Sequence, residues 1–187
     1  MHDQNRVVRW ITFFFLIVIT FQAKADEEWS IDKYKSLSYA RVNGEVIHGD
    51  MLNFFIGSHE NCQKVYNSFT FVTYKKPSDI NQLIGKNIPI KINDKNLTAK
   101  VQAVYPFFEM GYRVSFSLGT YPLKRYIDYL SNFYVEAKKF EIKIVDGIDF
   151  KAAKYFDITT NNWKLDKLVP SVLKARKLCK TISELES

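Results

Sequence analysis

The chain contains Tyr112-Arg113-Val114-Ser115-Phe116-Ser117-Leu118, in which apolar and polar residues alternate strictly. A period of two is typical of a β-strand that buries one face and exposes the other to water. Because parallel sheets are usually covered on both faces, a strand with one polar face favours an antiparallel sheet. The stretch therefore predicts a mainly β chain with antiparallel pairing.

The same pattern extends to both sides of this stretch. Further strands are predicted at residues 35–42, 45–56, 67–74, 88–92, 97–103, 140–144 and 155–158. Asn43-Gly44 predicts a tight hairpin turn between the first two of them. Residues 77–83 predict a short helical turn that ends at Gly85.

Two segments have helical spacing instead. Residues 122–133 begin with a proline, which the first turn of a helix tolerates. Residues 164–180 carry an apolar stripe that includes Cys179, and Pro170 requires this helix to begin near Leu168. The predicted fold is a mainly β (α+β) antiparallel β-sandwich with one mid-chain helix and one C-terminal amphipathic helix.

The N-terminal residues have the three parts of a secretory signal. Arg6 and Arg9 precede a run of 12 uncharged residues, 10–21, and Ala23-Lys24-Ala25 follows. A membrane-spanning helix needs roughly 20 apolar residues, so an uncleaved anchor is the less favoured alternative. The prediction is a signal peptide at 1–25, cleavage after Ala25, and a single domain at 26–187 without a stable membrane span.

The predicted mature chain has 162 residues and a formal charge of +5. That length suits one domain with its own hydrophobic core. The charge is too small to indicate a nucleic-acid-binding protein, so no nucleic-acid partner is expected.

Cys62 and Cys179 are the two cysteines of the chain. In an oxidising compartment, an even number of cysteines without metal-ligand spacing predicts a disulfide. The bridge would connect the C-terminal helix to an early strand, and two free buried thiols are the alternative.

The C-terminal third contains Tyr155-Phe156-Asp157-Ile158, Trp163 and an amphipathic helix that includes Cys179. This order resembles small periplasmic β-sandwich proteins of the invasion-associated locus B kind. The resemblance implies a non-enzymatic periplasmic protein that acts in envelope or host interaction. It assigns no functional residue.

Motifs for catalysis or cofactor binding are absent from the sequence: there is no Gly-x-Ser-x-Gly, glycine-rich phosphate loop or Cys-x-x-Cys. Histidine, acidic and cysteine side chains could be combined into a zinc site. These residues are His48, Asp50, His59, Glu60 and Cys62. Turn and edge roles around a disulfide explain them better, so no metal or cofactor is expected.

Three aspartates could supply a carboxylate pair for hydrolysis. They are Asp146, Asp149 and Asp157. Acidic residues at strand ends usually form turns, so the sequence favours a protein without catalytic activity while leaving an enzyme open.

Residues 106–111 join two alternating strands and are unusually apolar for a turn. An exposed apolar loop is a candidate contact surface, whereas a loop folded back on the core is the alternative. The candidate partner-contact residues are Phe107, Phe108 and Met110 in this loop, with Lys164, Lys167, Lys174 and Lys177 on the polar side of the last helix.

Together these patterns predict a periplasmic or secreted protein that binds another protein or an envelope component. The alternatives are a carrier of a small apolar ligand and a hydrolase with an unrecognised carboxylate site. A concave apolar pocket would favour the alternatives, and a filled core would favour the binding protein.

Overall fold

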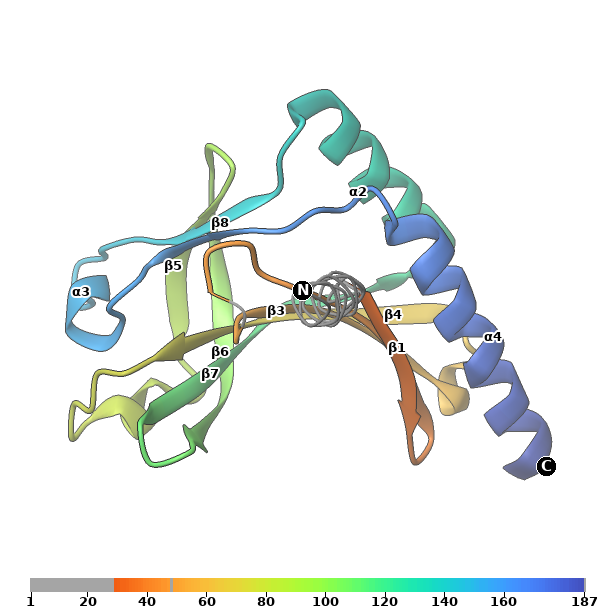
Figure 1. Cartoon of the computed structure of the whole chain (residues 1–187), viewed down its shortest axis with the longest axis horizontal. Coiled ribbons are helices and arrows are strands. Elements are labelled where there is room, and N and C mark those ends of the chain that lie inside the picture. The colour runs from red at the N-terminus through yellow and green to blue at the C-terminus, as the bar shows by residue number, and fades with distance from the viewer. Residues whose placement is uncertain (1–28, 48, 187) are drawn as a thin grey trace, which may run out of the picture.

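A computed structural model describes residues 29–47 and 49–186, so the predicted signal peptide at 1–25 lies outside the described residues. The described chain forms one nine-stranded sheet in the order β1-β2-β3-β4-β7-β6-β5-β8-β9 (Figure 1). The strands are β1 (Trp29–Tyr34), β2 (Leu37–Asn43), β3 (Met51–Gly57), β4 (Lys64–Thr73), β5 (Asn87–Ile92), β6 (Lys95–Phe107), β7 (Gly111–Pro122), β8 (Glu141–Ile144) and β9 (Thr160–Asn162). The helices are α2 (Leu123–Ala137), α3 (Ala152–Tyr155) and α4 (Leu168–Glu186), with short 3-10 helices η1 (Ser58–Glu60) and η2 (Ile80–Leu83).

The pairing of neighbouring strands is antiparallel, which confirms the predicted mainly β, antiparallel class. The predicted two-sheet sandwich is corrected, because the strands belong to a single sheet that curls into a half-barrel. Figure 1 shows the sheet turning through β6 and β5, so that β8 lies opposite β3 and β4. Alternation identifies which face of a strand is buried. It does not distinguish a face that packs on a second sheet from one that packs on another part of the same curled sheet.

Two irregularities accompany the curl of the sheet. The register between β4 and β7 shifts at Asn67/Ser68, and that between β6 and β7 shifts at Val101/Ala103. Such bulges bend a strand and increase its local twist. Gly119, opposite Asn67, has a φ of +123°, a conformation that glycine adopts readily.

The predicted hairpin at Asn43-Gly44 is wrong in detail. β3 begins at Met51 rather than at Glu45, and the segment between β2 and β3 contacts β9 instead of pairing with β2. The Glu45 backbone N–H donates to the Asn162 carbonyl oxygen at 2.9 Å. The described residues of this segment, 44–47 and 49–50, are called the β2–β3 loop below, and they connect the first half of the sheet to its last strand.

Two further differences concern short elements. β1 was not predicted: apolar and polar residues alternate only over Trp29-Ser30-Ile31-Asp32, and Lys33 breaks the pattern. The strand predicted at residues 155–158 is absent: Tyr155 ends the helix α3, an element beyond the two helices expected, and the last strand is β9. β9 is a polar three-residue strand, and apolar periodicity cannot detect it.

The C-terminal helix forms as its sequence requires. α4 begins at Leu168, so Pro170 lies in the first turn, where no intrahelical partner is lost. The apolar stripe of the segment is buried, and the helix packs across β1, β2 and β3. The predicted disulfide between Cys62 and Cys179 is confirmed, with 6.0 Å between the two Cα atoms.

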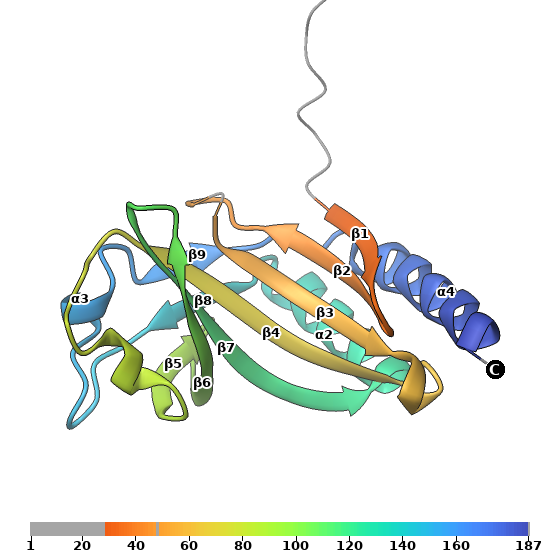
Figure 2. The same cartoon turned by 90° about the horizontal axis from the view of Figure 1, so that it is seen from below.

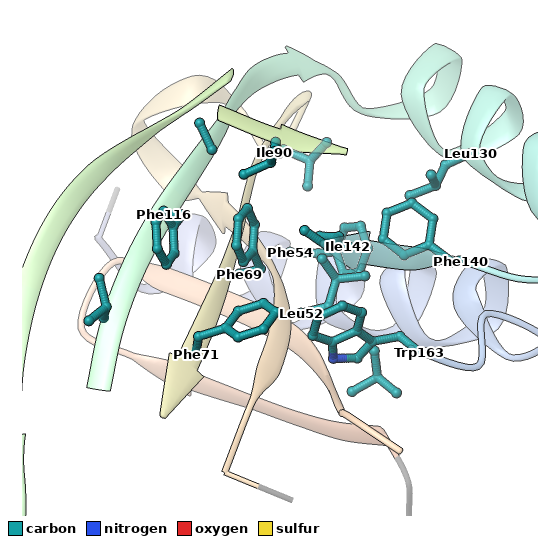
Figure 3. Close-up of a cluster of buried hydrophobic side chains, with 14 of the residues drawn as sticks. Leu52, Phe54, Phe69, Phe71, Ile90, Phe116, Leu130, Phe140, Ile142 and Trp163 are labelled. Carbon is teal, nitrogen blue, oxygen red and sulfur yellow. The ribbon is translucent and has the colours of Figure 1, made fainter. Parts of the chain in front are cut away.

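An aromatic core fills the concave side of the sheet. Figure 3 shows Phe69, Phe71 and Phe116 on one side of this core and Phe140 and Trp163 on the other. Phe69 stacks on Phe116 with ring centroids 4.7 Å apart, and Phe71 contacts Trp163 edge to face at 6.1 Å. The interior is therefore packed by large side chains.

Candidate functional site

The turn between β6 and β7 presents two apolar side chains to solvent. In this hairpin tip, residues 106–111, Phe108 is 76% exposed and Met110 is 51% exposed. The Met110 backbone N–H donates to the Phe107 carbonyl oxygen at 3.2 Å, and Lys76 Nζ donates to the Glu109 carbonyl oxygen at 2.7 Å. The tip is thus a defined turn at the end of two long strands, not a loop folded back on the core.

Phe107 differs from its neighbour. Its side chain is half-buried, the Arg113 guanidinium lies over its ring at 4.9 Å, and the Phe108 ring meets it at 5.0 Å. A Cβ added at Gly49 would lie 3.8 Å from the Phe107 ring, so this ring lies beside the β2–β3 loop. Of the candidate contact residues in the tip, Phe108 and Met110 are available to a partner and Phe107 mainly supports them.

The four candidate lysines are exposed, but they do not extend the surface of the hairpin tip. Lys174 and Lys177 belong to α4, and Lys167 immediately precedes it. Figures 1 and 2 place α4 and the hairpin tip at opposite ends of the long axis of the molecule. Lys164 Nζ forms an ion pair with Glu45 Oε1 at 3.3 Å. One contact surface that combines the tip with the lysines of α4 is therefore not formed.

Three of the residues considered for zinc binding, Asp50, Glu60 and Cys62, have other partners. Cys62 is in the disulfide, and Glu60 pairs with Lys64 Nζ at 2.9 Å. His48 lies outside the described residues. Among the residues that the structure does describe, no three histidine, cysteine or acidic side chains gather as a metal site would require.

Asp50 is buried and fixes the β2–β3 loop. Its Oδ1 accepts from the Val72 backbone N–H at 2.6 Å, and its Oδ2 accepts from Asn161 Nδ2 at 2.8 Å. Asn161 belongs to β9, and its own Oδ1 accepts from the Val46 backbone N–H. Burial raises the pKa of Asp50 to about 6, although both hydrogen bonds oppose this rise. A carboxyl group with this pKa is costly to ionise in the folded chain.

This raised pKa predicts a pH-dependent loss of stability. The pKa of about 6 in the folded chain lies above the ordinary value of 3.8, so the stabilisation is present below pH 3.8 and is lost as pH rises through about 6. The stability of the wild type relative to Asp50→Asn should fall by about 2–3 kcal/mol between pH 4 and pH 7. Urea unfolding of both proteins across this range measures the difference. A difference that does not change with pH would contradict the raised pKa.

Two of the three candidate carboxylates have structural roles. Asp146 Oδ1 accepts from the Ala152 backbone N–H at 2.9 Å, which positions the start of α3. Asp157 Oδ1 accepts from Thr73 Oγ1 at 2.7 Å and from the Tyr74 N–H at 3.1 Å. Asp149 is exposed. Hydrogen bonds that hold turns therefore explain Asp146 and Asp157, and no paired carboxylate site emerges from these residues.

A tyrosine-rich groove lies beside α2, and no sequence pattern predicted it. A hollow of about 290 Å³ lies between this helix and strands β5, β6 and β7. It is lined mainly by apolar and tyrosine side chains, including Tyr121, Tyr126, Tyr129 and Phe133. Tyr121 and Tyr126 stack with their ring centroids 4.3 Å apart. The groove brings α2 and the end of β7 together with residues of β5 and β6 from earlier in the chain. Only the tertiary structure could therefore reveal it.

In the part of the chain that the structure describes, no helix is long and apolar enough to span a bilayer. The sequence matches no known family model, no curated protein and no solved structure. The resemblance to the invasion-associated locus B proteins stays a hypothesis, and the function has to be argued from the geometry.

Proposed function

We propose that this chain is an exported, non-catalytic binding protein that contacts a protein of the cell envelope through Phe108 and Met110. The observation that carries the proposal is the hairpin tip: two large apolar side chains exposed on a turn that strands on both sides hold in place. The signal-like N-terminus and the long-range disulfide support export.

The backbone of Phe108 supports a role in contact. Phe108 has a φ of +49°, in the left-handed region that favours glycine and asparagine. A bulky residue there costs about 1–2 kcal/mol, and its exposed ring regains little of this by packing within the chain. Outliers of this kind concentrate where a side chain is needed for function. A phenylalanine that is locally unfavourable for folding is therefore explained by what it contacts outside the chain.

Replacing Phe108 with asparagine should stabilise the free protein. Asparagine adopts the left-handed conformation more readily, so the free energy of unfolding should rise by up to about 1 kcal/mol. The matched control is Val135→Asn, at a helical position that is 69% exposed, where a loss of about 0.5 kcal/mol or less is expected. Chemical denaturation of the three proteins measures this. A clear loss of stability in Phe108→Asn would show that its ring belongs to the core.

The contact itself can be tested with a photo-crosslinking amino acid at position 110. Irradiation in cells that export the chain should give one saturable adduct of defined mass. The adduct should disappear when Phe108→Asn is added and persist when Val135→Asn is added. The crosslinker at position 135 should give no such adduct. No saturable adduct at position 110, or one that is insensitive to Phe108→Asn, would refute the proposal.

The tyrosine-rich groove beside α2 favours a second candidate function, the binding of a small apolar ligand. Its volume of about 290 Å³ is at the lower end of the range for small-molecule sites. An environment-sensitive apolar dye should bind in this groove. Its binding should be lost when either of two exposed lining residues, Leu97 or Tyr129, is changed to a charged residue. Dye binding that these changes leave unaltered would exclude the groove.

A further inference from the structure

The tyrosine-rich groove beside α2 has a charged end. Lys95, at the start of β6, lines the groove, and no acidic side chain is among its described lining residues. Lys95 pairs across the strands with Ile92, and Leu97 pairs with the buried Ile90. Directly opposite residues lie on the same face of a sheet, so Lys95 and Leu97 start from the face that carries the core. The lysine therefore stands at the mouth of an apolar surface that leads from the exposed Leu97 towards the buried Ile90.

Apolar and aromatic side chains form the wall of the groove on the side of α2. Tyr129 and Phe133 are one helical turn apart, and their rings stack with centroids 6.3 Å apart. Leu130 and Phe140 also line the groove and are buried, and Figure 3 shows Leu130 pointing from α2 towards Phe140. These surfaces can cover a chain of methylene groups, but they carry no charge.

The stacked pair Tyr121 and Tyr126 presents rings to the groove rather than free hydroxyl groups. Tyr126 Oη donates to Asn67 Oδ1 at 2.7 Å, and Tyr121 Oη donates to the Leu118 carbonyl oxygen at 2.5 Å. A donor that already has a partner within the chain contributes little to the binding of a ligand. Other lining residues add hydroxyl groups, but the charge of the groove comes from Lys95.

Lys95 is held near the groove wall without being neutralised. Its Nζ lies 5.1 Å from the centroid of the Phe133 ring, and a cation–π contact of this kind uses none of the three N–H donors of the ammonium group. In the described part of the chain, Lys95 has no ion pair with an acidic side chain. Glu141 pairs instead with Lys139 at 3.8 Å, and the neighbouring Asp94 does not line the groove. The ammonium group is therefore available to an anion.

We propose that the groove binds a medium-chain fatty acid, with its acyl chain along the aromatic wall and its carboxylate at Lys95. The inference rests on the groove as a site for a small apolar ligand and names the class of that ligand. One ammonium group balances one carboxylate, whereas a dianion would keep an unbalanced charge and a cationic ligand would be repelled. Small-molecule sites combine apolar walls with a few polar groups that fix orientation, and a volume of about 290 Å³ suits a medium chain rather than a long one.

Titration calorimetry of the chain with octanoate and with octanol at pH 7 tests the role of Lys95. Lys95→Met removes the charge but keeps an apolar side chain, so octanoate should bind about fivefold more weakly while octanol binding stays nearly unchanged. Lys95→Arg keeps the charge and should keep most of the affinity for octanoate. The matched control is Lys100→Met, which removes an exposed lysine from the opposite face of β6 and should change neither affinity.

Chain length tests the apolar part of the site. From hexanoate to octanoate, the affinity should rise roughly fourfold for each added methylene group, because each group removes apolar surface from water. Leu97→Asp places a carboxylate in the lining and should weaken the binding of octanoate and octanol alike.

The outcomes separate this inference from the groove itself. If Lys95→Met leaves octanoate binding unaltered, or weakens octanol as much as octanoate, the fatty-acid assignment is overturned while the groove stays an apolar site. If octanoate and octanol bind but are insensitive to Leu97→Asp, they bind elsewhere, and the groove and the fatty-acid assignment both fail. Both also fail if neither probe binds the wild type. None of these results affects the contact proposed at the hairpin tip.

Discussion

Replacing Cys62 and Cys179 with alanine is expected to lower the free energy of unfolding by about 4–5 kcal/mol. The disulfide closes a loop across a sequence separation of 117 residues, and its loss increases the conformational freedom of the unfolded chain. It also removes the covalent link between α4 and the segment before β4. The polar links between them are weaker: Arg176 Nε donates to the Cys62 carbonyl oxygen at 3.2 Å, and its Nη2 donates to Gln63 Oε1 at 3.0 Å.

Urea unfolding of the double variant, with the wild type under oxidising and reducing conditions, measures this effect. Reduced wild type should unfold at about the same urea concentration as the double variant. Labelling of the denatured, unreduced protein should detect no free thiol at these two positions. Two reactive thiols per chain, or equal stability of the oxidised and reduced forms, would contradict the expectation.

Replacing Phe71 with alanine is expected to cost about 3–5 kcal/mol, because its ring is fully buried and the cavity left behind cannot be filled. Phe71 contacts Phe69, Phe116, Phe156 and Trp163, so it joins β4 and β7 to the segments around β9. It is therefore a central residue in the packing that keeps the half-barrel curled.

The matched control is Phe108→Ala, which removes the same ring from an exposed site and should change stability by less than about 0.5 kcal/mol. Denaturant unfolding with an unchanged slope would show that Phe71→Ala affects stability rather than the compactness of either state. Similar losses in both variants would contradict the assignment of Phe71 to the core and Phe108 to the surface.

Most strands and both longer helices could be predicted because each has its own period. Val114 and Phe116 are buried on β7 while Arg113 and Ser115 are only partly buried, as alternation requires. Leu168, Val172, Ala175 and Cys179 are buried along α4, as helical spacing requires. β9 could not be predicted in this way. Its place depends on Asn161, which bonds to Val46 and Asp50 more than a hundred residues earlier in the chain.

The candidate site was predicted in part. Apolar residues at a predicted turn are visible in sequence, so residues 106–111 could be selected, but only the structure shows that Phe108 and Met110 are exposed. The different roles of Phe107 and Phe108 could not, because they depend on which ring meets Arg113 and the β2–β3 loop. The helical spacing of the lysines in and before α4 predicts that they share one side of the helix. It does not predict how far that side lies from the hairpin tip.

By itself, the sequence determined the antiparallel class, the amphipathic C-terminal helix and the pairing of its two cysteines, because these follow from local periodicity and from residue counts. Only the tertiary structure decided that nine strands curl into one sheet and that Asp50 is buried against β9. The physical reason is that curvature and burial of charge arise from contacts between segments far apart in the chain, which no local pattern encodes.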